Sequence, residues 1–142
     1  MNLNPEIWGP HYWFFLHTIV ICYPNHPNAV TKKKYYDFIS NLPLFIPIEN
    51  IAGQFSKLLD KYPVTPYLDS RESFIKWMHF IHNKINESLE KPKLSLHDFY
   101  IQYYDNYKSP DIKNKDSTKW KQKLIYTITI LSVVFMTIYL YK

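Results

Sequence analysis

Residues 71–89 read RESFIKWMHFIHNKINESL, and they contain the clearest helical period in the chain. Apolar side chains recur in this stretch at steps of three and four residues, which is the spacing of one face of an α-helix. They are Phe74, Met78, Ile81, Ile85 and Leu89. Asp69 and Glu72 lie three residues apart and resemble a capping box, so we expect the helix to begin just after Asp69.

The rest of residues 1–107 predicts four more helices, separated by prolines. Their expected ranges are 5–22, 32–41, 48–62 and 95–104. Asn4 before Pro5, Thr31, and Ser95 paired with Asp98 are the expected caps. Only two glycines occur in 142 residues, which disfavours strand-and-turn folds because these usually need glycine at positive φ. The sequence therefore predicts an all-α protein with a small helical bundle.

Residues 124–141 are eighteen consecutive positions without a charged side chain. A helix of this length spans about 27 Å, close to the ~30 Å thickness of the hydrocarbon core of a bilayer. Aromatic side chains at both ends, Trp120 with Tyr126 and Tyr139 with Tyr141, are suited to the two membrane interfaces. We expect a transmembrane helix, because the alternative, a buried core helix, rarely lacks a polar face over five turns.

Residues 108–123 are expected to form a basic linker, and the part over residues 108–117 shows no periodicity and is expected to be flexible. Residues 108–142 carry the whole net charge of +5, whereas basic and acidic residues balance in residues 1–107. The lysines before the apolar segment predict a tail-anchored protein with its N-terminal domain in the cytosol. A neutral domain without a glycine-rich loop gives no support for nucleic-acid binding or phosphate-loop chemistry.

His79 and His82 form part of a second, polar stripe on the helix of residues 71–89. Three interpretations are open. The two histidines could belong to a metal site, although no convincing third ligand follows in the sequence, or they could bond to backbone or solvent. The third interpretation is an aromatic-lined cleft for a planar ligand, with Trp13 and His17 facing His82. Cys22 is the only cysteine, so one chain cannot form an intramolecular disulfide. We expect its thiol to pack in the ordinary way.

Several of these residues form motifs whose order and spacing resemble one family. The motifs are Trp8-Gly9, Trp13-x-x-Leu16-His17-Thr18, Tyr23-Pro24, Phe45-x-Pro47, Trp77-x-x-x-x-His82-Asn83-x-Ile85-Asn86 and Lys91-Pro92. Over residues 5–107 the chain resembles the FAD-linked sulfhydryl oxidases of the Erv/Alr family, in particular the membrane-tailed versions of large DNA viruses. The resemblance implies a four-helix bundle with a short fifth helix.

The resemblance also implies FAD as cofactor, bound in the mouth of the bundle. The residues expected to contact FAD are Gly9, Trp13, His17, Tyr23, His79, His82, Asn83, Ile85, Asn86, Lys91 and Tyr103. Aromatic faces can stack on flat rings, and asparagine and histidine side chains can bond to ring edges. The family further implies protein thiols as substrates, oxygen as electron acceptor, a possible homodimer, and a host or virion membrane.

One departure from the family pattern affects the expected chemistry. Family members carry Cys-x-x-Cys at the start of the third helix, and this chain has Ile48 and Ile51 at those two positions. Two interpretations are open. The chain is a thiol oxidase whose activity is impaired by the missing dithiol, or it is a membrane-anchored pseudo-oxidase, with or without flavin, that acts as an interaction module. In the second case an active thiol oxidase is a possible heterodimer partner.

Overall fold

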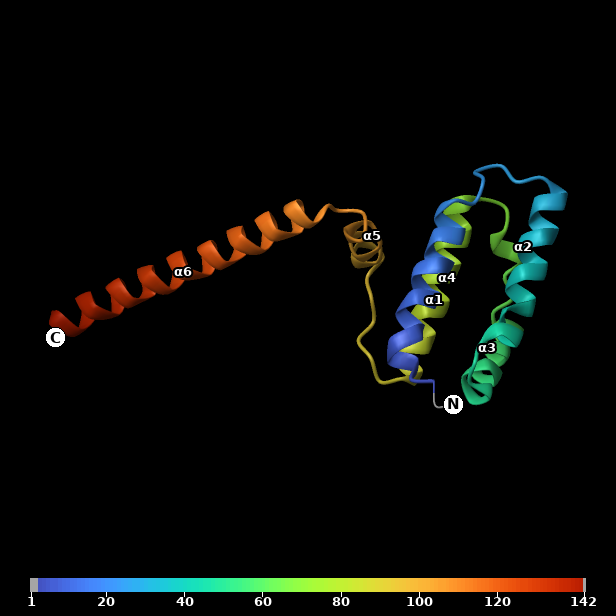
Figure 1. The fold of residues 1–142 in the computed structure, drawn as a ribbon, viewed down its shortest axis with the longest axis horizontal. Helices are drawn as coiled ribbons and strands as arrows, with labels where there is room; N and C mark the ends of the chain where they lie inside the picture. Colours follow the sequence, from blue (N-terminus) through green and yellow to red (C-terminus); the bar gives the residue numbers. More distant parts are fainter. Residues whose placement is uncertain (1–2, 142) are drawn as a thin grey trace. The chain divides into compact units, whose positions relative to one another are not determined.

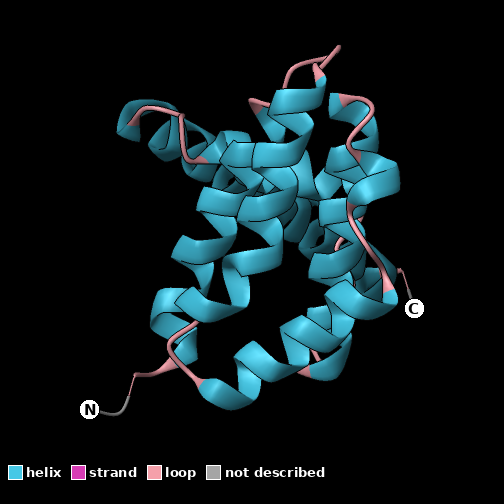
Figure 2. Cartoon of the chain, turned by 90° about the vertical axis from the view of Figure 1, so that its right-hand side faces the viewer, coloured by secondary structure: helices cyan, strands magenta, loops and turns pink. Residues whose placement is uncertain are grey.

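The chain folds into helices joined by short loops, with no strand among residues 3–141 (Figures 1 and 2). The computed structural model describes the backbone of these residues and, apart from residues 110–117, their side chains. The elements are α1 (Pro5–Ile21), α2 (Ala29–Asn41), the 3₁₀ helix η1 (Leu42–Phe45), α3 (Glu49–Lys61), the 3₁₀ helix η2 (Thr65–Tyr67), α4 (Arg71–Ser88), α5 (Leu96–Asp105) and α6 (Pro110–Leu140). The all-α prediction is confirmed.

Residues 1–103 form one compact unit and residues 104–142 a second. Within the first unit, α1 packs against α4, while α2 and α3 are joined through η1 (Figure 1). The short helix α5 follows α4 and completes the predicted arrangement of a four-helix bundle with a fifth helix.

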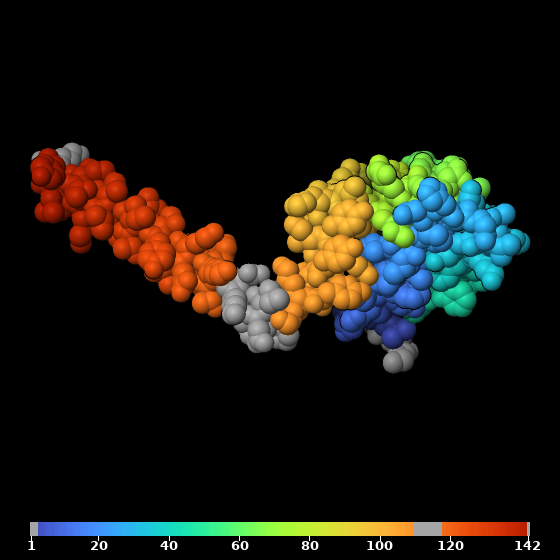
Figure 3. Space-filling model, turned by 90° about the horizontal axis from the view of Figure 1, so that it is seen from above, coloured from blue at the N-terminus to red at the C-terminus, as the bar shows by residue number. Residues whose placement is uncertain are grey.

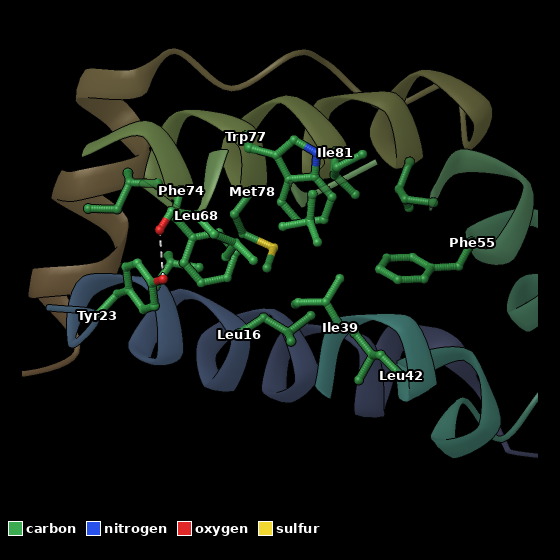
Figure 4. Packing of buried hydrophobic residues seen from close by; sticks show 14 of the residues in the cluster. Leu16, Tyr23, Ile39, Leu42, Phe55, Leu68, Phe74, Trp77, Met78 and Ile81 are labelled. Carbon is green, nitrogen blue, oxygen red and sulfur yellow. Dashed lines mark hydrogen bonds between the residues drawn. The ribbon is translucent and has the colours of Figure 1, made fainter. Parts of the chain in front are cut away.

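The core of the first unit is centred on α4, as the period of residues 71–89 predicted. Phe74, Met78, Ile81 and Ile85 are buried, and Figure 4 shows the first three facing Leu16 of α1 and Ile39 of α2. The prediction was wrong for Leu89, which is exposed because it is the C-cap residue and lies beyond the last full turn.

Two helices, α2 and α4, begin one to three residues away from their predicted starts. Asn28 caps α2, where its side chain accepts a hydrogen bond from the Thr31 amide, so Thr31 is not the cap. Ser70 caps α4, because the Asp69 carboxylate pairs with Lys32 instead. Serine and asparagine are as good at this position as threonine and aspartate, so sequence alone could not choose between neighbours.

Helix α4 ends in a Schellman turn at Glu90. The Lys91 amide donates to the Asn86 carbonyl and the Glu90 amide to the Glu87 carbonyl. Glu90 has a φ of 55°, in the left-handed region where a side chain is unfavourable and glycine is the usual residue.

Helix α6 starts earlier than expected. The expected linker is helical from Pro110 onward, since α6 begins there. Proline fits the first turn of a helix, where its missing N–H has no partner to lose. Within α6, Thr118–Leu140 is long and apolar enough to cross a membrane. Its side chains, orange to red in Figure 3, are exposed, as expected of a surface that faces lipid.

The backbone at Glu90 gives a first prediction. Glu90→Gly should raise the free energy of unfolding by about 1 kcal/mol, because glycine adopts positive φ without steric penalty. Urea unfolding of the full chain in mild detergent, followed by tryptophan fluorescence, measures the change. Glu87→Gly, inside the same helix, should lower the stability by a similar amount. If Glu90→Gly is no more stable than the unsubstituted protein, the backbone at Glu90 is not strained.

Candidate functional site

Trp13 and His17 of α1 meet His82 of α4 in a three-ring cluster. The Trp13 and His82 rings are stacked, with centroids 3.8 Å apart and an angle of 14° between their planes. His17 Nε2 lies 3.2 Å from His82 Nδ1, so one imidazole donates a hydrogen bond to the other. His82 lies at least 65 residues from His17 and Trp13 along the chain. The structure brings the three side chains together, as in one of the three interpretations that the sequence left open.

The two histidines of the cluster are held in their neutral form. Burial lowers the pKa of His17 to about 4, and the charge of His79 adds to this effect. Burial also lowers the pKa of His82 to about 3, with smaller contributions from His17, His79 and Lys91. A neutral pair can share one proton between facing nitrogens, whereas two imidazolium ions would repel each other.

Helix α5 covers the cluster from one side. The Phe99 ring, fully buried, contacts the edge of His17 at a centroid distance of 4.4 Å. The Tyr103 hydroxyl donates to Thr18 Oγ1 at 3.1 Å, and the Tyr103 ring stacks on Phe14. Tyr103 is thus beside α1 near the cluster, as its place in the predicted set suggested.

His79 and Asn83 bond to the backbone that follows α4, not to the cluster. His79 Nε2 lies 2.7 Å and Asn83 Nδ2 2.9 Å from the carbonyl oxygen of Leu94. The Leu94 amide donates to Asn83 Oδ1 at 2.7 Å. Both residues were expected to contact a cofactor, and the structure uses their polar atoms to hold the segment between α4 and α5.

Three further residues expected to contact FAD follow His82 along the chain and lie in different environments. Lys91 is exposed and lies close enough to His82 for its charge to lower the pKa of that imidazole. Asn86 is half-buried, and its carbonyl accepts the Lys91 amide. Ile85 belongs to the buried core.

Tyr23 is not brought to the cluster. It is fully buried, packs edge-on against Tyr35 and Phe74, and donates from its hydroxyl to the Leu68 carbonyl at 2.8 Å (Figure 4). A tyrosine with its ring in the core and its hydroxyl satisfied by backbone has a structural role.

Gly9 lies one turn before Trp13 on the same face of α1, since residues four apart share a face. A Cβ atom built on Gly9 would meet nothing within 4 Å. Protein packing therefore does not require glycine at this position, although glycine weakens a helix by about 0.5–1 kcal/mol relative to alanine. The space over Gly9 is open.

The start of α3 carries no sulfur. Ile48 is the N-cap residue and makes no side-chain cap, and Ile51 lies in the first turn; both are half-buried. The expectation that Cys22 packs inside the protein was wrong: it is the C-cap residue of α1 and its side chain is exposed, because the helix ends there. Among the described residues, no three histidine, cysteine, aspartate or glutamate side chains are close enough to hold a metal ion.

Two features of this unit escaped the sequence analysis. The buried Trp8 indole Nε1 has no hydrogen-bond partner among the described residues. On the face of α1 that carries Tyr12 is an apolar pocket of about 340 Å³. It is lined by His11, Tyr12, Phe15, Phe38, Leu42 and Phe45. The run of apolar residues near residue 45 was a signal for the pocket, but its partner residues on α1 and α2 could only be found from the fold.

The family model of the Erv1 / Alr family matches residues 10–105 of this chain. That range includes α1 from residue 10 onward, α2 to α5, and all three rings of the cluster. The chain belongs to the Erv1 / Alr family. A protein of Acanthamoeba polyphaga mimivirus named as a probable FAD-linked sulfhydryl oxidase is 32% identical over 119 residues, which are 83% of this chain and 81% of that protein.

Other Erv1 / Alr proteins resemble the bundle alone. The mitochondrial FAD-linked sulfhydryl oxidase erv1 of Schizosaccharomyces pombe is 33% identical over 84 residues, 59% of this chain and 46% of that protein. The crystal structure of the FAD binding domain of Erv1 from Saccharomyces cerevisiae has a TM-score of 0.66 at 28% identity, and the match covers 73% of this chain and 97% of that domain. The fold is therefore that of the family.

The neutral histidines predict a pH-dependent stability. Their folded-state pKa values, about 4 and about 3, lie below the ~6.5 of unfolded histidine, so the unfolded chain binds more protons below that pH. The stability they support is complete above about pH 6.5 and falls with decreasing pH, by up to about 1.4 kcal/mol per pH unit for each histidine. Urea unfolding of the full chain between about pH 6.5 and 5, above the range of most carboxylates, measures this slope.

His82→Phe retains a ring against Trp13 and removes one titrating group, so the slope should fall by about half. His26→Gln, in the exposed loop before α2, is the matched control and should leave the slope unchanged. Equal slopes for His82→Phe and the unsubstituted protein would show that His82 is not buried in neutral form.

Proposed function

We propose that this chain binds FAD at the Trp13–His17–His82 cluster and is a thiol oxidase that depends on thiols from outside its own domain. The observation that carries the proposal is the cluster itself: a stacked indole and two neutral imidazoles between α1 and α4. Family relatives named as FAD-linked sulfhydryl oxidases support it.

The residues present fit a large, flat and anionic cofactor. Trp13 is partly exposed and offers an aromatic face, and the open space over Gly9 lies on the same side of α1. Lys91 supplies a cation near His82 for a diphosphate. The unpartnered Trp8 indole N–H is a further donor on the same helix. Neutral imidazoles can donate to or accept from ring edges without adding a buried charge.

Bound FAD would supply a two-electron acceptor that passes electrons on to oxygen. In the balanced reaction, two thiols lose two electrons and two protons and form a disulfide, while oxygen becomes hydrogen peroxide. Neither thiol can come from Ile48 or Ile51, and Cys22 is a single exposed thiol. At least one of the two sulfurs must therefore belong to a partner protein or to a small thiol, and turnover should be slow.

A second candidate function is that of a membrane-anchored pseudo-oxidase that contributes an interface. The apolar pocket on α1, α2 and η1 favours it, because Phe15 and Phe45 at its rim are half or more exposed. A second copy of this chain or an active thiol oxidase of the same family would be the partner. In both functions α6 anchors the protein, with Lys119, Lys121 and Lys123 on the cytosolic side of a host or virion membrane.

FAD binding is tested at Gly9. Without FAD, Gly9→Ala should stabilise the full chain by about 0.5–1 kcal/mol, because the added methyl meets no atom. Gly9→Leu should lower the flavin content of the purified protein by about tenfold or more, since its side chain would occupy the space proposed for the cofactor. Flavin absorbance per protein, after purification in detergent with added FAD, is the measurement.

Gly53→Leu is the matched control, because Gly53 also lies in a helix with no atom within 4 Å of its Cβ position. It should retain the flavin. If Gly9→Leu keeps its flavin as Gly53→Leu does, the cofactor binds elsewhere. If the unsubstituted protein contains no flavin, the proposed oxidase function is ruled out and the interaction module is left.

The missing dithiol can be restored by the double substitution Ile48→Cys and Ile51→Cys. A thiol at the start of α3 is favoured as a thiolate by the helix N-terminus, so oxygen consumption with dithiothreitol should rise about tenfold or more over the unsubstituted protein. Ser56→Cys with Leu59→Cys, at the same spacing further along α3, should give no rise. A flavin-loaded double variant without added activity would refute the proposal that only the sulfurs are missing.

A further inference from the structure

Asn83 pairs with both backbone groups of Leu94. Its Oδ1 accepts the Leu94 amide at 2.7 Å, and its Nδ2 donates to the Leu94 carbonyl at 2.9 Å. Only a side-chain amide offers a donor and an acceptor in this arrangement, which is the pattern by which one peptide group pairs with another. The orientation of the Asn83 amide is therefore fixed by Leu94.

His79 reinforces the same contact from one helical turn earlier. The Leu94 carbonyl has two lone pairs, and it accepts from His79 Nε2 at 2.7 Å as well as from Asn83 Nδ2. Since a carbonyl cannot donate, Nε2 carries the proton. His79 Nε2 and Asn83 Nδ2 lie 3.1 Å apart because both donate to the same carbonyl oxygen.

Leu94 is followed directly by Ser95, the residue that caps the start of α5. Ser95 Oγ accepts the Asp98 amide at 3.0 Å and donates to the Asp98 carboxylate at 2.6 Å, which caps the helix. Phe99, one turn further, lies between His17 and His79, with ring centroids 4.4 Å and 5.9 Å away. A shift of Leu94 would move Ser95 and with it the ring that covers His17.

We propose that Asn83 is a positioning residue whose side chain fixes the start of α5 and thereby keeps Phe99 over the His17–His82 pair. It acts on the cluster through the Leu94 backbone and not by touching a ligand. The consequence for FAD rests on the proposed function, because only a closed cluster keeps water from the cofactor site. The contact with Leu94 does not depend on FAD and can be tested without it.

The test uses Asn83→Leu, which has a similar volume and neither donor nor acceptor, in the full FAD-free chain in detergent micelles. Hydrogen exchange of the Leu94 amide should become at least about tenfold faster. The pKa values of His17 and His82, followed by NMR of ¹³C-labelled histidine, should rise by about one unit or more toward 6.5 as water reaches the pair. His79 and Lys91, which also face the pair, are both retained in this variant.

Asn41→Leu is the matched control, since Asn41 also bonds to backbone, at the Asp37 carbonyl, but within its own helix. It should change neither measurement. If Asn83→Leu does not fold, Ser95→Ala tests the same series of contacts from the other side of Leu94 and should shift the two titrations in the same direction. Unchanged histidine titrations, in whichever of the two variants folds, would overturn the proposal. A chain that passes this test but binds no FAD would refute the proposed function alone.

Discussion

The hydrogen bond between His17 and His82 joins the two helices on which the site depends. It lies where α1 packs against α4, with the His17 side chain buried and the His82 side chain half-buried. Two such groups can be buried together because each is neutral and satisfies the other. Charging either ring would leave a buried cation beside a second histidine, so the same contact that closes the bundle also makes it sensitive to acid.

Helix α4 serves three purposes with three of its faces. Phe74, Met78 and Ile81 form the core, His82 meets α1, and His79 with Asn83 holds the segment that leads to α5. Because residues three and four apart share a face, one helix can carry all three stripes without conflict. A change in the rotation of α4 would therefore disturb the core, the cluster and the cover of the cluster together.

The binding features and the redox features of this family are separated in this chain. The rings suited to a flavin come from α1 and α4, and the cation, Lys91, from the segment after α4, whereas the dithiol expected from the resemblance would lie at the start of α3. Isoleucine at positions 48 and 51 carries no thiol and suits the bundle, since branched aliphatic side chains pack readily at a half-buried position. In the proposed function, the cluster on α1 and α4 therefore binds the cofactor without a thiol from the start of α3.

The sequence by itself determined the five helices of the bundle and the apolar helix at the C-terminus, because helical period is a local property. The meeting of Trp13, His17 and His82 was one of three open interpretations, and the tertiary structure decided it. Only the tertiary structure decided that Tyr23 belongs to the core, that Asn83 and His79 bond to Leu94, and that Cys22 is exposed. Polar side chains take whichever partner the fold brings within about 3 Å, and residues that lie far apart in the sequence, such as Tyr23 and Leu68, reveal that partner only after the helices have packed.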